Sequence, residues 1–134
     1  MSMFSIFGIS GSAVSAQSQR LNVVASNLAN VDAVAGPDGQ AYKARQVVFQ
    51  TVPIGAEKAP GVAVSNITEN QAEGRRIYDP SSPMANTEGY VVHSNVNPVE
   101  EMVNMISASR SYQNNVEVMN TTKNLLLKTL QLGQ

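Results

Sequence analysis

The feature that most constrains the fold of this chain is the long stretch between Pro98 and Gly133, which contains no other proline or glycine. Helix signals mark its beginning, because Asn97 is a favourable N-cap residue and proline is well tolerated at the first helical position. Glu100 and Glu101 place negative charge in the first turn, where the helix dipole favours it. A glycine suits the far end. We therefore predict one helix that begins at Pro98 and ends just before Gly133.

Apolar residues recur within this stretch at steps of three and four, which is the spacing of one face of a helix. Seven of the nine positions in this series are apolar, and the nine are Met102, Met105, Ser109, Tyr112, Val116, Met119, Lys123, Leu126 and Leu130. The pattern predicts an amphipathic helix that packs against a partner.

The beginning of the chain, up to about Val34, is predicted to form a second helix. It contains no proline and carries apolar residues at intervals of seven. Those residues are Phe7, Val14, Leu21 and Leu28. Ser10 or Ser12 is a candidate N-cap, and a start nearer Ser5 is the alternative. We expect this helix to pair with the C-terminal one as an antiparallel coiled coil.

The middle of the chain has a different character, with most of the prolines and glycines. Short runs of β-branched and aromatic residues between such turn residues predict β-hairpins. The runs lie around residues 47–49, 62–67, 77–78 and 90–93. The sequence Gly-Pro-Asp-Gly at residues 36–39 is a strong turn signal.

These patterns predict a mainly α fold with a small β insert. Residues 1–34 and 96–134 are expected to form a discontinuous helical domain, with long N- and C-terminal helices. Residues 35–95 are expected to form a β-rich insert with extended loops. The chain has 134 residues, which is the usual size of one domain.

Composition excludes several classes of function. Charged residues make up 14% of the chain, well below the roughly 25% of an average globular protein. The 9 Lys and Arg against 10 Asp and Glu give a net charge of −1, so a broad electrostatic surface for nucleic acid or an anionic membrane is excluded. The chain has no cysteine and a single histidine, His93, which excludes disulfides, thiolate metal sites and a multi-histidine metal site.

Targeting signals are weak. No apolar run approaches the roughly 18 residues of a membrane span, so we expect no direct membrane insertion. A secretory signal peptide needs a positive start and an unbroken apolar stretch, whereas here no Lys or Arg precedes Arg20, and serine and glycine interrupt the run. The sequence Val-Ser-Ala at residues 14–16 is compatible with signal-peptidase cleavage, which leaves a cleaved signal as the less favoured alternative.

Motifs that carry chemistry are scarce. The sequence holds neither a Gly-rich phosphate loop with a following lysine nor a dinucleotide-binding fingerprint. His93 lies in a predicted strand without an evident catalytic partner, so a surface or packing role is favoured. Adjacent residues on a helix point about 100° apart, so Glu100 and Glu101 do not make a catalytic pair. We therefore predict no enzyme activity, no cofactor and no metal.

The polar faces of both predicted helices carry Ser, Asn, Gln and Ala rather than the Glu and Lys usual in water-facing helices. Small and amide side chains allow close approach and hydrogen bonds across a packed contact. We favour burial of these faces between subunits. Ordinary variation on a solvent-exposed face is the alternative.

The two ends of the chain resemble a known family. The sequence SNLANVD at residues 26–32 closely resembles the N-terminal signature of the bacterial flagellar axial proteins, which include rod and hook subunits. The sequence SASRSYQNN at residues 107–115 resembles their C-terminal helix. Residues 36–49 and 127–133 are similar to the proximal-rod members of the family in particular.

The resemblance implies a structural subunit of the flagellar basal-body rod that polymerises through its terminal helices and transmits torque across the periplasm. It implies type III export as an unfolded chain, without a cleaved signal peptide. The implied partners are other rod proteins, the adaptor that joins the rod to the inner-membrane ring, further copies of the chain and the export apparatus. The rival readings are a soluble helical-hairpin protein-binding module, an export-associated adaptor and, more remotely, an enzyme.

The resemblance also implies a set of subunit contacts on the two helical ends. These residues are Leu21, Asn22, Asn27, Asn30, Asp32, Glu101, Asn104, Arg110, Tyr112, Gln113 and Asn114.

Overall fold

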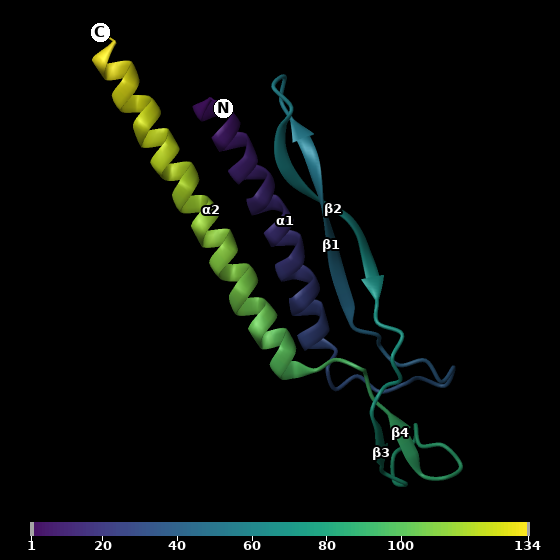
Figure 1. Cartoon of the computed structure of the whole chain (residues 1–134). Coiled ribbons are helices and arrows are strands. Elements are labelled where there is room, and N and C mark those ends of the chain that lie inside the picture. Colours follow the sequence, from purple (N-terminus) through teal and green to yellow (C-terminus); the bar gives the residue numbers. More distant parts are fainter. Residues whose placement is uncertain (1, 134) are drawn as a thin grey trace. The chain divides into compact units, whose positions relative to one another are not determined.

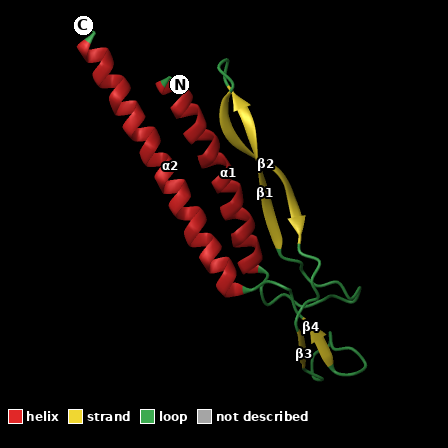
Figure 2. Cartoon of the chain, in the orientation of Figure 1, coloured by secondary structure: helices red, strands yellow, loops and turns green. Residues whose placement is uncertain are grey.

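The computed structural model describes residues 2–133, and it contains two long helices with four strands between them in the sequence (Figures 1 and 2). The elements, in chain order, are α1 (Met3–Ala29), β1 (Arg45–Ile54), β2 (Ala59–Glu69), β3 (Arg76–Tyr78), β4 (Tyr90–Val92) and α2 (Pro98–Leu132). The strands form two two-stranded sheets, one of β1 with β2 and one of β3 with β4. The prediction of a mainly α chain with a small β insert is confirmed.

Helix α2 has the bounds that its end signals predict. The Asn97 side-chain oxygen accepts hydrogen bonds from the backbone N–H groups of Val99, at 3.1 Å, and Glu100, at 3.3 Å. It therefore pairs two of the amide groups that the first turn leaves without a partner inside the helix. At the other end, the Gly133 N–H donates to the Thr129 carbonyl oxygen at 3.2 Å.

Helix α1 begins close to the alternative start near Ser5 and ends earlier than predicted. Its N-cap is Ser2, whose Oγ accepts from the Ser5 N–H at 3.1 Å, so the helix begins upstream of the candidate caps Ser10 and Ser12. It ends at Ala29 rather than near Val34. The Asn30 side-chain amide donates to the Ser26 carbonyl oxygen at 2.8 Å, and a turn follows. An asparagine that bonds the backbone locally in this way favours the end of a helix.

The chain divides into two compact units. Unit 1 comprises residues 1–21, 47–66 and 106–134, and unit 2 comprises residues 22–46 and 67–105. Both long helices and the β1–β2 sheet contribute residues to each unit.

Within unit 1, the two helix segments run side by side in opposite directions, with strand segments of β1 and β2 next to α1 (Figure 1). Gly11 of α1 faces Met119 of α2, because a Cβ atom at Gly11 would lie 3.9 Å from the Met119 Cε. The Ser12 hydroxyl oxygen accepts from the Val62 N–H at 3.1 Å, which ties β2 to α1. The absence of a side chain at Gly61 leaves room for Ile54, whose Cδ1 would lie 1.8 Å from a Cβ there.

Within unit 2, β3 and β4 pair antiparallel, with Arg76 opposite Val92 and Tyr78 opposite Tyr90. A single bridge between Val34 and His93 extends the pairing, and the Ala35 N–H donates to the Val92 carbonyl oxygen at 2.8 Å. The buried apolar side chains of this unit are small: Val24, Ala35, Ala44, Val91 and Val96. Polar groups therefore contribute much of what specifies this unit.

Candidate subunit interface

Helix α2 exposes large apolar side chains near its beginning. Val99 is 69% exposed, Met102 is 56% exposed and Val103 is 60% exposed. Residues three and four positions apart lie on the same face of a helix, so these three side chains form one apolar stripe. Burying a Val or Met side chain is worth about 1.5–3 kcal/mol, so the stripe is a favourable surface for a partner.

Unit 1 exposes a second apolar surface, where the beginning of α1 lies beside the end of α2. Phe4 is 76% exposed, and together with Phe7 of α1 it lines a hollow of about 350 Å³. Lys123, Leu126 and Leu127 of α2 line the other side. A large aromatic side chain left in water beside leucines is typical of a surface that a partner covers.

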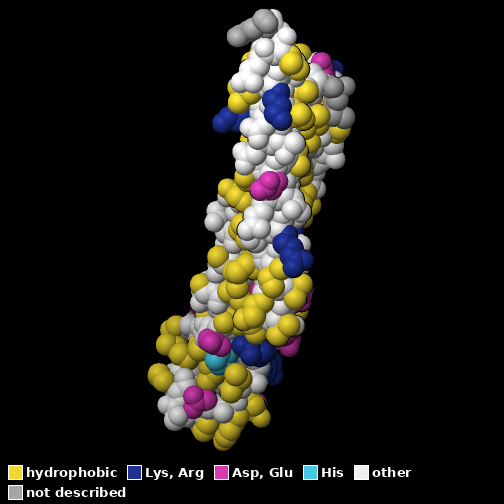
Figure 3. Space-filling view, turned by 90° about the vertical axis from the view of Figure 1, so that its left-hand side faces the viewer, with side chains coloured by type: hydrophobic (Ala, Val, Ile, Leu, Met, Phe, Trp, Pro, Cys, Tyr) yellow, Lys and Arg dark blue, Asp and Glu magenta, His cyan; other side chains and the backbone are white. Residues whose placement is uncertain are grey.

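Charged side chains are few on the face drawn in Figure 3: in its upper half they stand apart among apolar and neutral polar groups, and toward its lower end several lie close together. Two ion pairs lie in unit 2: Arg45 with Glu69 and Arg75 with Asp32, both at 3.8 Å and both largely exposed. Exposed pairs of this kind contribute little to stability. Association through such a surface therefore depends mainly on apolar and amide groups.

The residues predicted to make subunit contacts differ in exposure. Asn27 and Glu101 are buried, Leu21, Asn30, Asn104 and Tyr112 are half-buried, and Asn22, Asp32, Arg110, Gln113 and Asn114 are exposed. The exposed members are open to a neighbour as the chain stands, whereas the two buried members are covered by residues of their own chain.

The two buried members have different surroundings. Asn27 hydrogen bonds with Arg45 and Tyr42 of its own unit, and no part of its side chain reaches the surface. Glu101 is 6% exposed, and its Oε2 has no hydrogen-bond partner among residues 2–133. Leaving a buried acceptor unpaired is costly, so a donor supplied from outside the chain would stabilise this carboxylate.

The apolar stripe predicted for α2 includes Met102, but it misses Val99 and Val103 beside it. Their signal is present, because Val99, Met102 and Val103 have helical spacing just after the N-cap. The predicted stripe, which continues from Met102 through Met105 and Tyr112, does not include them.

The prediction also misses Tyr42, whose hydroxyl donates to Asn27, and Asn95, whose side-chain oxygen accepts from the Ala44 N–H. No local pattern distinguishes these two residues from other polar residues.

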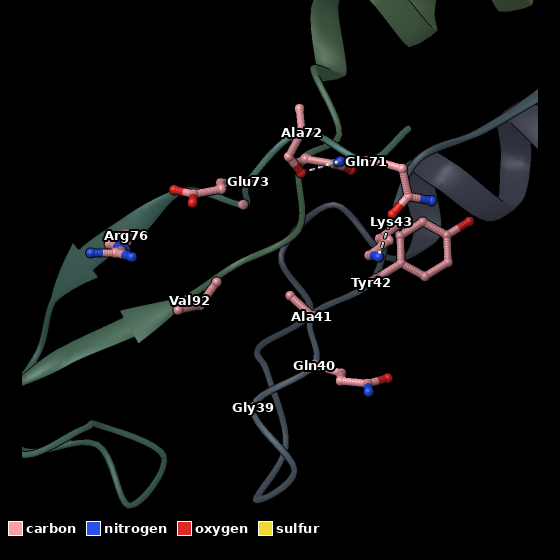
Figure 4. Close-up of a pocket in the computed structure, with 12 residues that line it drawn as sticks. Gly39, Gln40, Ala41, Tyr42, Lys43, Gln71, Ala72, Glu73, Arg76 and Val92 are labelled. Atoms are coloured by element: carbon pink, nitrogen blue, oxygen red, sulfur yellow. Dashed lines mark hydrogen bonds between the residues drawn. The ribbon is translucent and has the colours of Figure 1, made fainter. Parts of the chain in front are cut away.

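A polar cleft of about 420 Å³ lies in unit 2, with residues 39–43 on one side and residues 71–76 on another (Figure 4). The Lys43 ammonium group donates to the Gln71 side-chain oxygen at 2.7 Å within it. Arg76 and Glu73 line the cleft as well. No Ser, Thr, His or Cys side chain is among the described residues of its lining, so it offers no nucleophile–base pair of the hydrolase type.

Neither helix, over the described residues, has the combination of length and apolar character that crossing a membrane requires.

Comparison with known proteins gives consistent matches. Residues 8–37 match the family model described as "Flagella basal body rod protein", and residues 87–132 match the model described as "Flagellar basal body rod FlgEFG protein C-terminal". The chain is 58% identical over 134 residues to the flagellar basal-body rod protein FlgC of Yersinia enterocolitica, with 100% of both chains covered. It is 55% identical over 134 residues to FlgC of Salmonella typhimurium strain LT2 and 49% identical over 136 residues to FlgC of Buchnera aphidicola subsp. Acyrthosiphon pisum, again with 100% of each chain covered.

Proposed function

The chain belongs to the FlgC family of flagellar basal-body rod proteins, and we propose that it joins the rod through the exposed faces of its two long helices. Members of this family are structural components of the rod and not enzymes. The chain is accordingly a structural part of the bacterial flagellum that assembles with other rod components.

The observation that carries the proposed mode of assembly is the apolar stripe of Val99, Met102 and Val103 on α2. These side chains are open to water in the single chain, and their burial against neighbouring helices supplies a favourable free energy. In a symmetric or helical assembly one such contact is repeated at every equivalent site. Torque is then spread over many small contacts.

The predicted contact residues add polar groups to this surface. Asn22, Arg110, Gln113 and Asn114 are exposed on the two helices, and their amide and guanidinium groups offer directional hydrogen bonds to a neighbour. We propose that these four contact adjacent subunits directly. Asn27 contributes by holding its own chain in shape.

We further propose that α1 and α2 pair as an antiparallel coiled coil, within a helical domain of residues 1–34 and 96–134 that carries residues 35–95 as an insert. The approach of Gly11 to Met119, and of Phe4 and Phe7 to the segment containing Leu126, supports an antiparallel register. A small residue opposite a long one is the kind of complementarity that brings two helices close together.

Export and further partners follow from the same reading. We propose that the chain leaves the cytoplasm unfolded through the flagellar type III apparatus, without a cleaved signal peptide, and lies in the periplasmic rod. Its neighbours there would be other rod proteins, copies of itself and the adaptor between the rod and the inner-membrane ring. The weak signal-peptide pattern and the absence of cysteine agree with this route.

The proposal is tested by isolating intact basal bodies and detecting the chain in their rod fraction, with a strain lacking its gene as the control. We expect the chain in the rod and restored motility on complementation.

Circular dichroism of the isolated chain gives a second test, because helices without their packing partners are marginally stable. Fully and cooperatively folded terminal helices in isolation would favour the self-contained binding module instead.

A further inference from the structure

Asn27, near the end of α1, holds the backbone at the beginning of β1. Its Nδ2 donates to the Arg45 carbonyl oxygen at 2.8 Å, and its Oδ1 accepts from the Arg45 N–H at 3.0 Å. The Tyr42 hydroxyl donates to the same Oδ1 at 2.8 Å. The side chain is 0% exposed. Asn27 therefore pairs both backbone polar groups of Arg45, as a neighbouring strand would.

A second asparagine, Asn95, holds the preceding residue. Its Oδ1 accepts from the Ala44 N–H at 2.6 Å, and its Nδ2 donates to the carbonyl oxygens of Asn70, at 2.8 Å, and Ala72, at 2.9 Å. Asn95 lies shortly before α2 begins at Pro98. It thus joins the segment before β1, the segment after β2 and the entry to α2, all within unit 2.

The backbone N–H groups of two consecutive residues, Ala44 and Arg45, therefore both donate to asparagine side-chain oxygens. Ala44 is buried, and its carbonyl oxygen accepts from the Asn70 N–H at 2.8 Å. A buried backbone N–H that loses its hydrogen-bond partner is removed from water without compensation, which lowers the stability of the folded chain. Hydrogen bonds in such a network are cooperative, because each bond fixes the position of groups that form the next bond.

We propose that Asn27 and Asn95 form an asparagine latch, which couples the beginning of β1 to the end of α1 and to the entry of α2. The backbone at Ala44–Arg45 becomes ordered only when both of these places are formed, since Asn27 pairs both backbone groups of Arg45 and Asn95 pairs the N–H of Ala44. The latch goes beyond the proposed assembly contacts because it acts within one chain. It also gives Asn27, the first of the two asparagines in the SNLANVD sequence, an internal role.

The latch predicts that the two asparagines act as a unit. The test is residue-by-residue amide hydrogen exchange, measured by NMR on the full chain with an osmolyte that favours the compact state. In the wild type, we expect the Ala44 and Arg45 amides to exchange slowly. We expect Asn27→Ala and Asn95→Ala each to accelerate exchange at both amides by about tenfold or more, the order expected when a buried hydrogen bond is lost. The double variant should be little worse than either single one.

Two further variants separate the latch from general loss of folding. Tyr42→Phe removes one hydroxyl bond to Asn27 and leaves both backbone bonds, so its effect should be much smaller. Asn27→Asp keeps one acceptor oxygen, but it replaces the donor to the Arg45 carbonyl oxygen with a second acceptor and buries a negative charge, so it should accelerate exchange at least as much as Asn27→Ala. The Val116 amide, in unit 1, reports on unfolding elsewhere and should keep its wild-type rate.

The latch is overturned if each single variant accelerates only the amide that it bonds directly and the double variant shows the simple sum. Free exchange of the Ala44 and Arg45 amides in the wild type would also overturn it. Neither result bears on membership of the rod, because the basal-body fractionation is a separate measurement.

Discussion

At the scale of single residues, unit 2 depends on close backbone approaches that only small groups permit. Gly74 is the tightest of these, because a Cβ there would lie 2.0 Å from the His93 carbonyl oxygen and 3.1 Å from the Val92 Cγ1. The neighbouring backbone is held in place by the hydrogen bond from the His93 N–H to the Arg75 carbonyl oxygen at 2.7 Å. Because backbone atoms cannot rotate aside, a side chain at residue 74 must push the two segments apart.

We therefore expect Gly74→Ala to lower the free energy of unfolding of unit 2 by about 1–3 kcal/mol, the usual cost of overpacking. Urea titration followed by the near-UV circular dichroism of the tyrosines measures this, since Tyr78 and Tyr90 stack edge to face in unit 2. Gly36→Ala is the matched control, because the nearest atom there is a side-chain oxygen of Asp38 at 3.3 Å and not a backbone atom. Equal midpoints for the two variants would show that the approach at Gly74 is not constraining.

At the scale of elements, α2 depends on its N-cap. Asn97→Ala removes the acceptor for the Val99 and Glu100 N–H groups and should destabilise the helix by about 1 kcal/mol. Asn97→Asp keeps an acceptor oxygen and should behave like the wild type. Far-UV circular dichroism against temperature measures the difference. A wild-type melting curve for Asn97→Ala would mean that packing alone determines where α2 begins.

Helix α1 carries glycines in its interior, and these weaken it. A Cβ at Gly11 would meet nothing closer than the Met119 Cε at 3.9 Å, which is an ordinary contact. Gly11→Ala should therefore raise the helicity of the isolated chain and stabilise α1 by about 1 kcal/mol, because alanine loses less backbone entropy on folding. The readout is far-UV circular dichroism at a fixed temperature. Reduced helicity would show that the helices approach more closely at this point than the structure has them.

At the scale of the whole molecule, assembly should depend on the apolar stripe more than on charge. Met102→Lys places a charge at the centre of the stripe, and burial of an unpaired charge between subunits is strongly unfavourable. Because Met102 is 56% exposed in the single chain, the fold itself should tolerate the change. We expect a chain with unchanged circular dichroism that is strongly depleted from purified basal bodies, with loss of swimming.

Met102→Leu is the control for this prediction, because it conserves volume and apolar character. It should enter basal bodies at the wild-type level. Normal incorporation of Met102→Lys would place the stripe at a position in the rod that remains in contact with water, and the proposed packing would then be wrong.

Local signals predicted much of the fold. The Asn97 cap, the following proline and the glycine-free run define α2 from end to end, because helix ends are specified by groups a few residues away. The short β-branched runs and the turn at residues 36–39 also lie where predicted. Helix α1 was less well predicted, since Ser2 caps it and Asn30 ends it, and serines and asparagines elsewhere in the same segment look equivalent.

The sequence by itself determined that both terminal segments are helical, that the middle is a β insert, that the charge is low and that the chain belongs to this family. These properties depend on composition and on residues adjacent in the chain. Only the tertiary structure decided which asparagines are buried and which apolar side chains stay in water. Asn27 meets Arg45, and Asn95 meets Ala44, across long separations in the sequence. The physical reason is that burial and pairing are properties of neighbours in space, and such neighbours leave no periodic trace in the order of residues.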